Sequence, residues 1–183
     1  KRSHVGQAAQ NGLNCATMAA EGFKGPSQAF EGQWGYLHAY ASGGDKKKAL
    51  DGLGNKFETL NLGVKPYPSC RYSHAAIDGI IDLKKELDFS IDDLDDIDIG
   101  LSETALNIIG YPLEDKQNPK SIVDGQFSMP FCAAVAAKSG GLKWDDYKDH
   151  LNNNETLALC NKIKVNPDKD AEKCCPEFMS AKV

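Results

Sequence analysis

Four side chains that can carry or transfer a proton are concentrated in residues 65–74, whose sequence is KPYPSCRYSH. They are the ammonium group of Lys65, the thiol of Cys70, the guanidinium group of Arg71 and the imidazole of His74. Cationic groups next to an imidazole can hold a carboxylate and move a proton beside it. We call residues 65–74 the lysine-to-histidine segment, and we predict that it binds an anionic substrate.

A strand is expected before this segment. Within the expected strand over residues 57–65, positions 60–65 alternate apolar and polar, which places Leu60, Leu62 and Val64 on one face, toward a core. Lys65 would then leave from the opposite face and be available for chemistry. The two prolines that follow end the strand because each removes a backbone donor.

A helix is expected after the segment. Residues 74–87 place apolar side chains at helical spacing, and Ser73 is a candidate N-cap. Arg71 and His74 would lie at the helix N-terminus, where partial positive charge favours a bound carboxylate.

Each of these residues also has an ordinary structural explanation. Lys65 can be a strand-end lysine, His74 can cap a helix, and Arg71 can pair with a neighbouring acid. Cys70 can line a pocket, but a nucleophilic thiol needs a base partner that the sequence does not identify.

The rest of the chain mixes helices and strands. Residues 97–101 predict a strand with alternate side chains inward, and the apolar run 127–137 predicts a buried helix with Pro130 in its first turn and Gly140 at its end. A helix over 155–162 is expected to run into a further strand. Because strands and helices do not alternate regularly, we predict an α+β fold.

Two domains are predicted. An Ala- and Gly-rich helix over residues 5–23 needs a helical partner, and residues 41–45 (ASGGD) are typical of a linker. We therefore interpret residues 1–44 as the end of an all-helical domain and residues 45–183 as a small domain of helices and strands.

Composition excludes several classes of function. A net charge of −5 with dispersed basic residues argues against nucleic-acid binding. No apolar run approaches the roughly 20 residues of a membrane span, and no signal-peptide pattern is present. Six cysteines without a C-x-x-C pair indicate a reduced intracellular compartment. The acidic run at residues 92–96 precedes a strand and is interpreted as a solvated loop, so no metal site is expected.

Four stretches together resemble the MmgE/PrpD family, which includes 2-methylcitrate dehydratase, cis-aconitate decarboxylase and iminodisuccinate epimerase. Residues 1–9 (KRSHVGQAA) are similar to the family's active-site lysine and the small-residue helix that follows it. Gly25-Pro26 together with Glu31-Gly32 resembles the turn after that helix. The lysine-to-histidine segment is the third stretch, and residues 125–131 (GQFSMPF) resemble the family's FS-x-P-Y/F helix start. Their order is that of the family. One decarboxylase branch carries a histidine where Cys70 stands, which weighs against that activity here.

The resemblance implies a lyase or isomerase reaction next to a carboxylate, without a metal or an organic cofactor. It implies that the second domain is a lid, that Lys1, Lys65 and Arg71 hold substrate carboxylates, and that His74 assists proton transfer. Further pocket residues that it suggests are His4, Cys70 and Ser128, although helix capping is an alternative for Ser128. Dehydration of a citrate-like di- or tricarboxylate of the 2-methylcitrate type is expected first, with cis-aconitate decarboxylation and iminodisuccinate epimerisation as alternatives.

Members of the family are more than twice as long as this chain. We therefore interpret the chain as an internal piece or one half of a split enzyme, truncated at its C-terminus, in the cytoplasm or in mitochondria. The expected partners are a polycarboxylate substrate and either a second copy in a homodimer or a complementing N-terminal helical chain. A non-catalytic remnant or assembly module is the alternative if the chain is the complete product.

Overall fold

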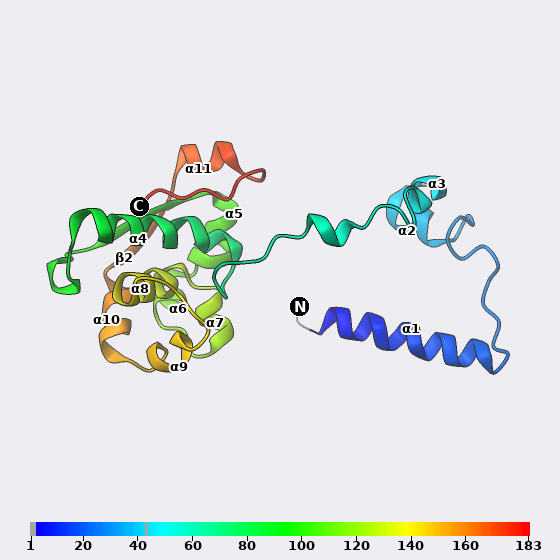
Figure 1. Cartoon of the computed structure of the whole chain (residues 1–183), viewed down its shortest axis with the longest axis horizontal. Helices are drawn as coiled ribbons and strands as arrows, with labels where there is room; N and C mark the ends of the chain where they lie inside the picture. The colour runs from blue at the N-terminus through cyan, green and yellow to red at the C-terminus, as the bar shows by residue number, and fades with distance from the viewer. Residues whose placement is uncertain (1–2, 43) are drawn as a thin grey trace. The chain divides into compact units, whose positions relative to one another are not determined.

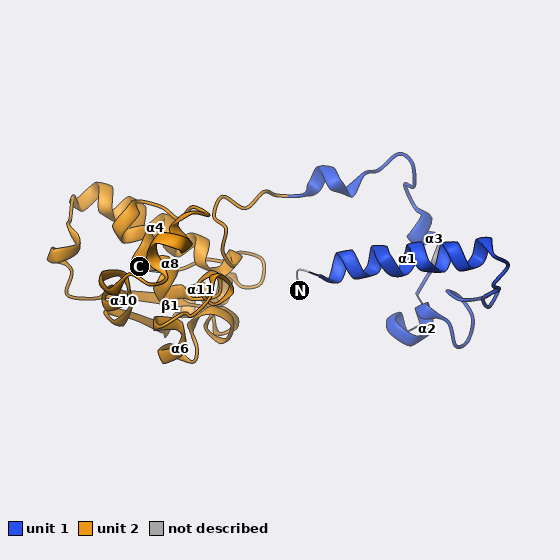
Figure 2. Cartoon of the chain, turned by 90° about the horizontal axis from the view of Figure 1, so that it is seen from below, with its two compact units in different colours: residues 1–62 blue, residues 63–183 orange. Residues whose placement is uncertain are grey.

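The computed structural model describes residues 3–42 and 44–183, with the side chain of residue 46 left out (Figure 1). The chain divides into two compact units, Lys1–Leu62 and Gly63–Val183 (Figure 2). The boundary between domains at residue 44 stays a prediction.

The described elements of the first unit are helical. They are α1 (His4–Ala20), α2 (Tyr36–Ala41), α3 (Lys46–Leu50) and a 3-10 turn, Glu58–Asn61. The helix predicted over residues 5–23 is confirmed as α1, and no residue of α1 is buried. Its small-residue face is therefore exposed in this unit.

The strand predicted over residues 57–65 is wrong. The chain forms the 3-10 turn and then an irregular stretch, and the side chains of Leu60, Leu62 and Val64 are 86%, 74% and 95% exposed. Alternation of apolar residues shows which side chains would share a face, but a strand also needs a neighbouring strand to pair with. The described residues of this region have no such neighbour.

The second unit is built on a two-stranded parallel sheet. Strand β1 (Ile97–Leu101) pairs with β2 (Ile163–Pro167), with Ile97 opposite Ile163. The inward side chains of both strands are buried, as predicted for 97–101. Parallel strands need a crossover of a dozen or more residues, which the helices between the strands supply. The other edge of β1 carries an antiparallel bridge from Gly100 to Lys182.

Helix α8 (Met129–Ser139) lies at the centre of the second unit and contacts α4 (His74–Leu87), α10 (Asn154–Asn161) and β2 (Figure 1). Every residue from Met129 to Ala137 is buried, which confirms the predicted buried helix. Pro130 lies in its first turn, and Gly140 ends it with a φ of +70°, a value that glycine adopts without steric cost. Burial of a single side chain such as Phe131 stabilises the unit by about 1.5–3 kcal/mol.

Short helices complete the second unit around this core, and the fold is α+β as predicted. None of the helices in the described part of the chain is both long and apolar enough to cross a membrane. The short elements are α5 (Glu103–Ala105), α6 (Leu113–Gln117), α7 (Ile122–Gln126), α9 (Asp146–His150), α11 (Lys169–Cys174), the π-helical turn Leu106–Gly110 and the 3-10 turns Arg71–Ser73 and Ile91–Asp93.

Candidate functional site

The lysine-to-histidine segment is the first part of the second unit and leads directly into α4. It begins with bends around its two prolines, continues through the 3-10 turn Arg71–Ser73 and ends at His74, the first residue of α4. The helix predicted over residues 74–87 is confirmed with the same bounds. The segment therefore places Arg71 and His74 at a helix N-terminus, as expected.

The predicted cap of that helix is wrong. Ser73 has helical backbone angles, and its hydroxyl does not bond to the first turn of α4. It donates instead to the Cys70 carbonyl at 2.8 Å and lies 2.8 Å from the Ser69 hydroxyl. An N-cap residue typically has extended backbone geometry, whereas the 3-10 turn before α4 gives Ser73 helical angles.

Lys65 folds back onto its own segment. Its ammonium group donates a hydrogen bond of 3.1 Å to the Ser69 carbonyl, although the residue as a whole is exposed. Both Lys65 and the exposed Arg71 act electrostatically on His74. The structure thus brings the two predicted cations and the predicted imidazole into one neighbourhood.

His74 is buried, with 1% of its surface exposed, and neither ring nitrogen has a hydrogen-bond partner among the described residues. Burial and the Arg71 guanidinium hold the pKa of His74 below its ordinary value of 6.5, with a further contribution from Lys65. The backbone of Ser69 and the charge of Asp78 act on the pKa of His74 in the opposite direction. A neutral imidazole beside two cations can accept a proton or a hydrogen bond.

Tyr67 and Asp78 belong to the same neighbourhood, and the sequence reasoning missed both. The Tyr67 hydroxyl donates to Asp78 Oδ1 at 2.5 Å, and its ring meets the His74 ring edge-on. Burial, together with the hydrogen bond to Asp78 and its charge, raises the pKa of Tyr67 to about 12. Tyr67 therefore stays protonated at neutral pH. The spacing of Asp78 one turn after His74 is the signal that could have indicated its place.

Cys70 is half-buried, and its backbone N–H donates to the Gln126 carbonyl at 2.9 Å. Ser128 is buried and caps α8, since its hydroxyl accepts from the Phe131 N–H at 3.0 Å and donates to the Lys116 carbonyl. Ser128 thus takes the capping role that is the alternative to a pocket role, and contact of Ser128 or Cys70 with substrate stays a prediction.

The two residues predicted from the start of the chain belong to the first unit. Lys1 lies outside the described residues, and His4 is the exposed first residue of α1 in the first unit. Their roles stay predictions. Over the residues that the structure describes, no group of three or more His, Cys, Asp and Glu side chains could hold a metal ion.

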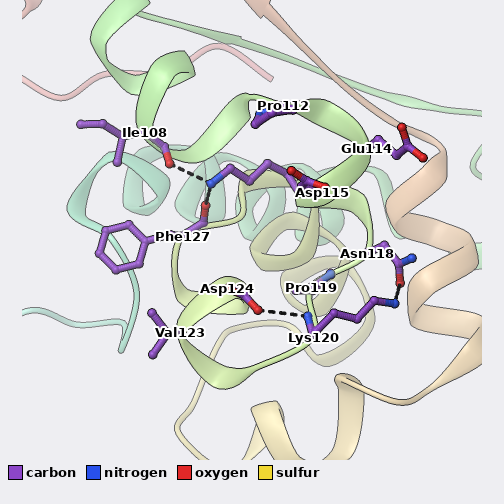
Figure 3. A pocket seen from close by; sticks show the side chains of 11 residues that line it. Ile108, Pro112, Glu114, Asp115, Asn118, Pro119, Lys120, Val123, Asp124 and Phe127 are labelled. Atoms are coloured by element: carbon purple, nitrogen blue, oxygen red, sulfur yellow. Dashed lines mark hydrogen bonds between the residues drawn. The ribbon is translucent and has the colours of Figure 1, made fainter.

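A cavity of about 610 Å³ lies elsewhere in the second unit, beside α6 and α7 (Figure 3). Its lysines are engaged: Lys116 donates to the Ile108 and Phe127 carbonyls at 3.0 and 2.8 Å, and Lys120 donates to Asn118 at 2.6 Å. Three acidic side chains also line the cavity, so its charge does not favour a polycarboxylate. The acidic residues are Glu114, Asp115 and Asp124.

Comparison with known proteins gives the same family for both units. The model of the MmgE/PrpD C-terminal domain matches residues 67–183, and that of the MmgE/PrpD N-terminal domain matches residues 1–49. The C-terminal match includes Arg71 and His74 and begins two residues after Lys65.

Two fungal proteins are similar over most of the chain. The cis-aconitate decarboxylase-like protein oryM of Aspergillus oryzae is 25% identical over 175 residues, which are 88% of this chain and 36% of that protein. The cis-aconitate decarboxylase of Aspergillus terreus is 22% identical over 178 residues, 89% of this chain and again 36% of the relative. The chain thus spans little more than a third of the length of these relatives.

Proposed function

Because the chain belongs to the MmgE/PrpD family, we propose that it forms part of a lyase acting on a citrate-like di- or tricarboxylate. The observation that carries the proposal is the neighbourhood of Lys65, Arg71 and His74. Two cations there lie close to a buried imidazole whose pKa is lowered and whose nitrogens have no partner in the described residues. Lys65 and Arg71 hold substrate carboxylates, and His74 assists proton transfer.

The chemistry follows from charge. Removal of a proton beside a carboxylate builds negative charge on the substrate, so neighbouring cations stabilise the transition state more than the ground state. In dehydration, the C–H proton passes to a base, and hydroxide leaves from the adjacent carbon with a proton as water. Lys1, His4, Cys70 and Ser128 are proposed as further substrate contacts, and a homodimer or a complementing helical chain as the partner.

Dehydration of the 2-methylcitrate type is the first choice, and decarboxylation is the second. The names of the fungal relatives favour the second, in which a C–C bond breaks, carbon dioxide leaves and the resulting carbanion takes a proton. The cysteine at position 70 favours the first, because one decarboxylase branch resembles this segment but has histidine there.

Turnover assays on the protein purified from its source test the proposal. Incubation with 2-methylcitrate and with cis-aconitate, followed by mass spectrometry of the products, separates loss of water from loss of carbon dioxide. Lys65→Ala is expected to lower turnover by about 10²–10³-fold. The matched control is Lys85→Ala, which removes an exposed lysine of α4. If neither substrate is consumed and neither binds, the chain is better explained as an assembly module.

A further inference from the structure

The carbonyl of Pro68, in the middle of the lysine-to-histidine segment, accepts two hydrogen bonds from distant side chains. Gln126 Nε2 donates to it at 2.7 Å and the Tyr147 hydroxyl at 3.1 Å. The backbone of the segment returns one bond, from the Cys70 N–H to the Gln126 carbonyl at 2.9 Å. Three hydrogen bonds therefore hold two residues of the segment, Pro68 and Cys70, against α7 and α9.

The groups that hold this carbonyl are themselves anchored. Gln126 is the last residue of α7, and the next carbonyl along, that of Phe127, accepts the Lys116 ammonium at 2.8 Å (Figure 3). The Ser128 hydroxyl donates to the Lys116 carbonyl. Two hydrogen bonds to Lys116 of α6 therefore hold the junction between α7 and α8.

Tyr147 is anchored by packing. It is fully buried in α9, and its ring stacks on Phe131 of α8 with centroids 5.8 Å apart. Gly125 leaves the space for this ring, because a Cβ atom there would lie 3.1 Å from Tyr147 Cε1. The hydroxyl is thereby aimed from the core at the segment.

Pro68 lies midway along the chain between the two cations. Pro68 stands three residues from both Lys65 and Arg71, and the Lys65 ammonium rests on the carbonyl of the next residue, Ser69. Small displacements of groups that hold a substrate lower rates strongly, by about 10²-fold for 1 Å. The two side chains that donate to the Pro68 carbonyl therefore act on the stretch of chain between the two cations.

We infer that Gln126 and Tyr147 are positioning residues, which hold the Pro68 carbonyl and thereby orient Lys65 and Arg71 toward a carboxylate substrate. This inference rests on the proposed function for its catalytic consequence, whereas the ordering of the segment stands on the three hydrogen bonds.

The test compares Tyr147→Phe and Gln126→Met with the matched control Gln117→Met. Gln117 also donates from Nε2 to a backbone carbonyl, that of Ile163 at 3.2 Å, but in the sheet and away from the segment. Thermal unfolding followed by circular dichroism identifies variants that fold. Should Gln126→Met fail to fold, Tyr147→Phe, which keeps the ring, carries the test.

Alkylation of Cys70 reports order in the segment independently of turnover. A pulse of iodoacetamide is followed by peptide mass spectrometry, with the exposed Cys15 as internal reference. Loss of one hydrogen bond of about 1 kcal/mol is expected to raise the rate at Cys70 about fivefold in Tyr147→Phe and Gln126→Met. The rate in Gln117→Met is expected to stay unchanged.

Turnover then separates positioning from stability. The two segment variants are expected to lose about 10–100-fold in kcat with little change in KM, while Gln117→Met keeps the wild-type kcat. If the wild type neither turns over nor binds either substrate but Cys70 is alkylated faster in the two segment variants, the ordering role is supported and the proposed function is overturned. Alkylation and kcat equal to those of the control overturn the inference.

Discussion

The ring of Tyr67 meets the imidazole of His74 edge to face, with centroids 5.3 Å apart and planes at 86°. The hydroxyl of the same tyrosine donates to Asp78 one turn further along α4. Tyr67 thus contacts with its ring an imidazole that lacks hydrogen-bond partners in the described residues. Its hydroxyl bonds at the same time to the next turn of α4.

The stability of the folded chain should fall in mild acid because of His74. Its pKa is lower in the folded chain than its ordinary value of 6.5, so the unfolded chain binds more protons between these two values. The contribution of His74 to the free energy of unfolding is therefore fully present above about pH 6.5 and is lost as the pH falls toward the pKa of His74 in the folded chain. Thermal unfolding between about pH 8 and about pH 5 should show a smaller loss for His74→Gln than for the wild type.

The exposed His38 provides the control for this experiment. His38→Gln removes an imidazole from the surface and is the matched control for the substitution itself. An unchanged pH dependence in His74→Gln would show that the buried imidazole does not limit stability in acid.

The pKa of Tyr67 should depend on Asp78 more than on Asp82. Burial is the largest cause of its raised value of about 12, followed by the hydrogen bond and charge of Asp78 and then by the charge of Asp82. Asp78→Asn should therefore lower the pKa of Tyr67 but leave it above 10.0, the ordinary tyrosine value, since burial remains. Asp82→Asn should lower it less. Titration of the Tyr67 ring carbon signals by NMR measures both shifts, and equal effects of the two variants would contradict this order of causes.

Gly125 should tolerate no side chain, whereas Gly141 should tolerate one. A Cβ atom at Gly125 would lie 3.1 Å from Tyr147 and 3.2 Å from Phe131, but at Gly141 it would meet no atom within 4 Å. Gly125→Ala is expected to lower the free energy of unfolding by about 1–3 kcal/mol because both rings are fixed in the core. Gly141→Ala should change it by less than about 1 kcal/mol. Urea denaturation measures both, and equal losses would mean that the contact at Gly125 relaxes freely.

Much of the second unit could be predicted from the sequence because its signals are local. The apolar spacing of α4, the alternation of Ile97, Ile99 and Leu101 and the unbroken apolar run of α8 each lie within one element. The prediction of a strand before Lys65 is wrong because a strand needs a neighbouring strand to pair with, and no local sequence pattern indicates one.

The candidate site could be predicted only in part for the same reason. Lys65, Arg71 and His74 share one short segment, so their proximity follows from the chain itself. The hydrogen bonds of Pro68 join residues 58 and 79 positions apart, and no periodicity connects such partners. The burial of His74 likewise depends on tertiary packing, including the Tyr67 ring, which only the folded unit defines.

The most direct test of the central claim is an NMR titration of His74 in the 183-residue chain with cis-aconitate. If the lysine-to-histidine segment holds a polycarboxylate, the His74 ring signals shift saturably, and the affinity falls by about 10-fold or more in Lys65→Ala. Acetate, which offers a single carboxylate, should produce little shift at the same concentration. His74 signals that do not move, or that move equally with acetate or in Lys65→Ala, would contradict the account.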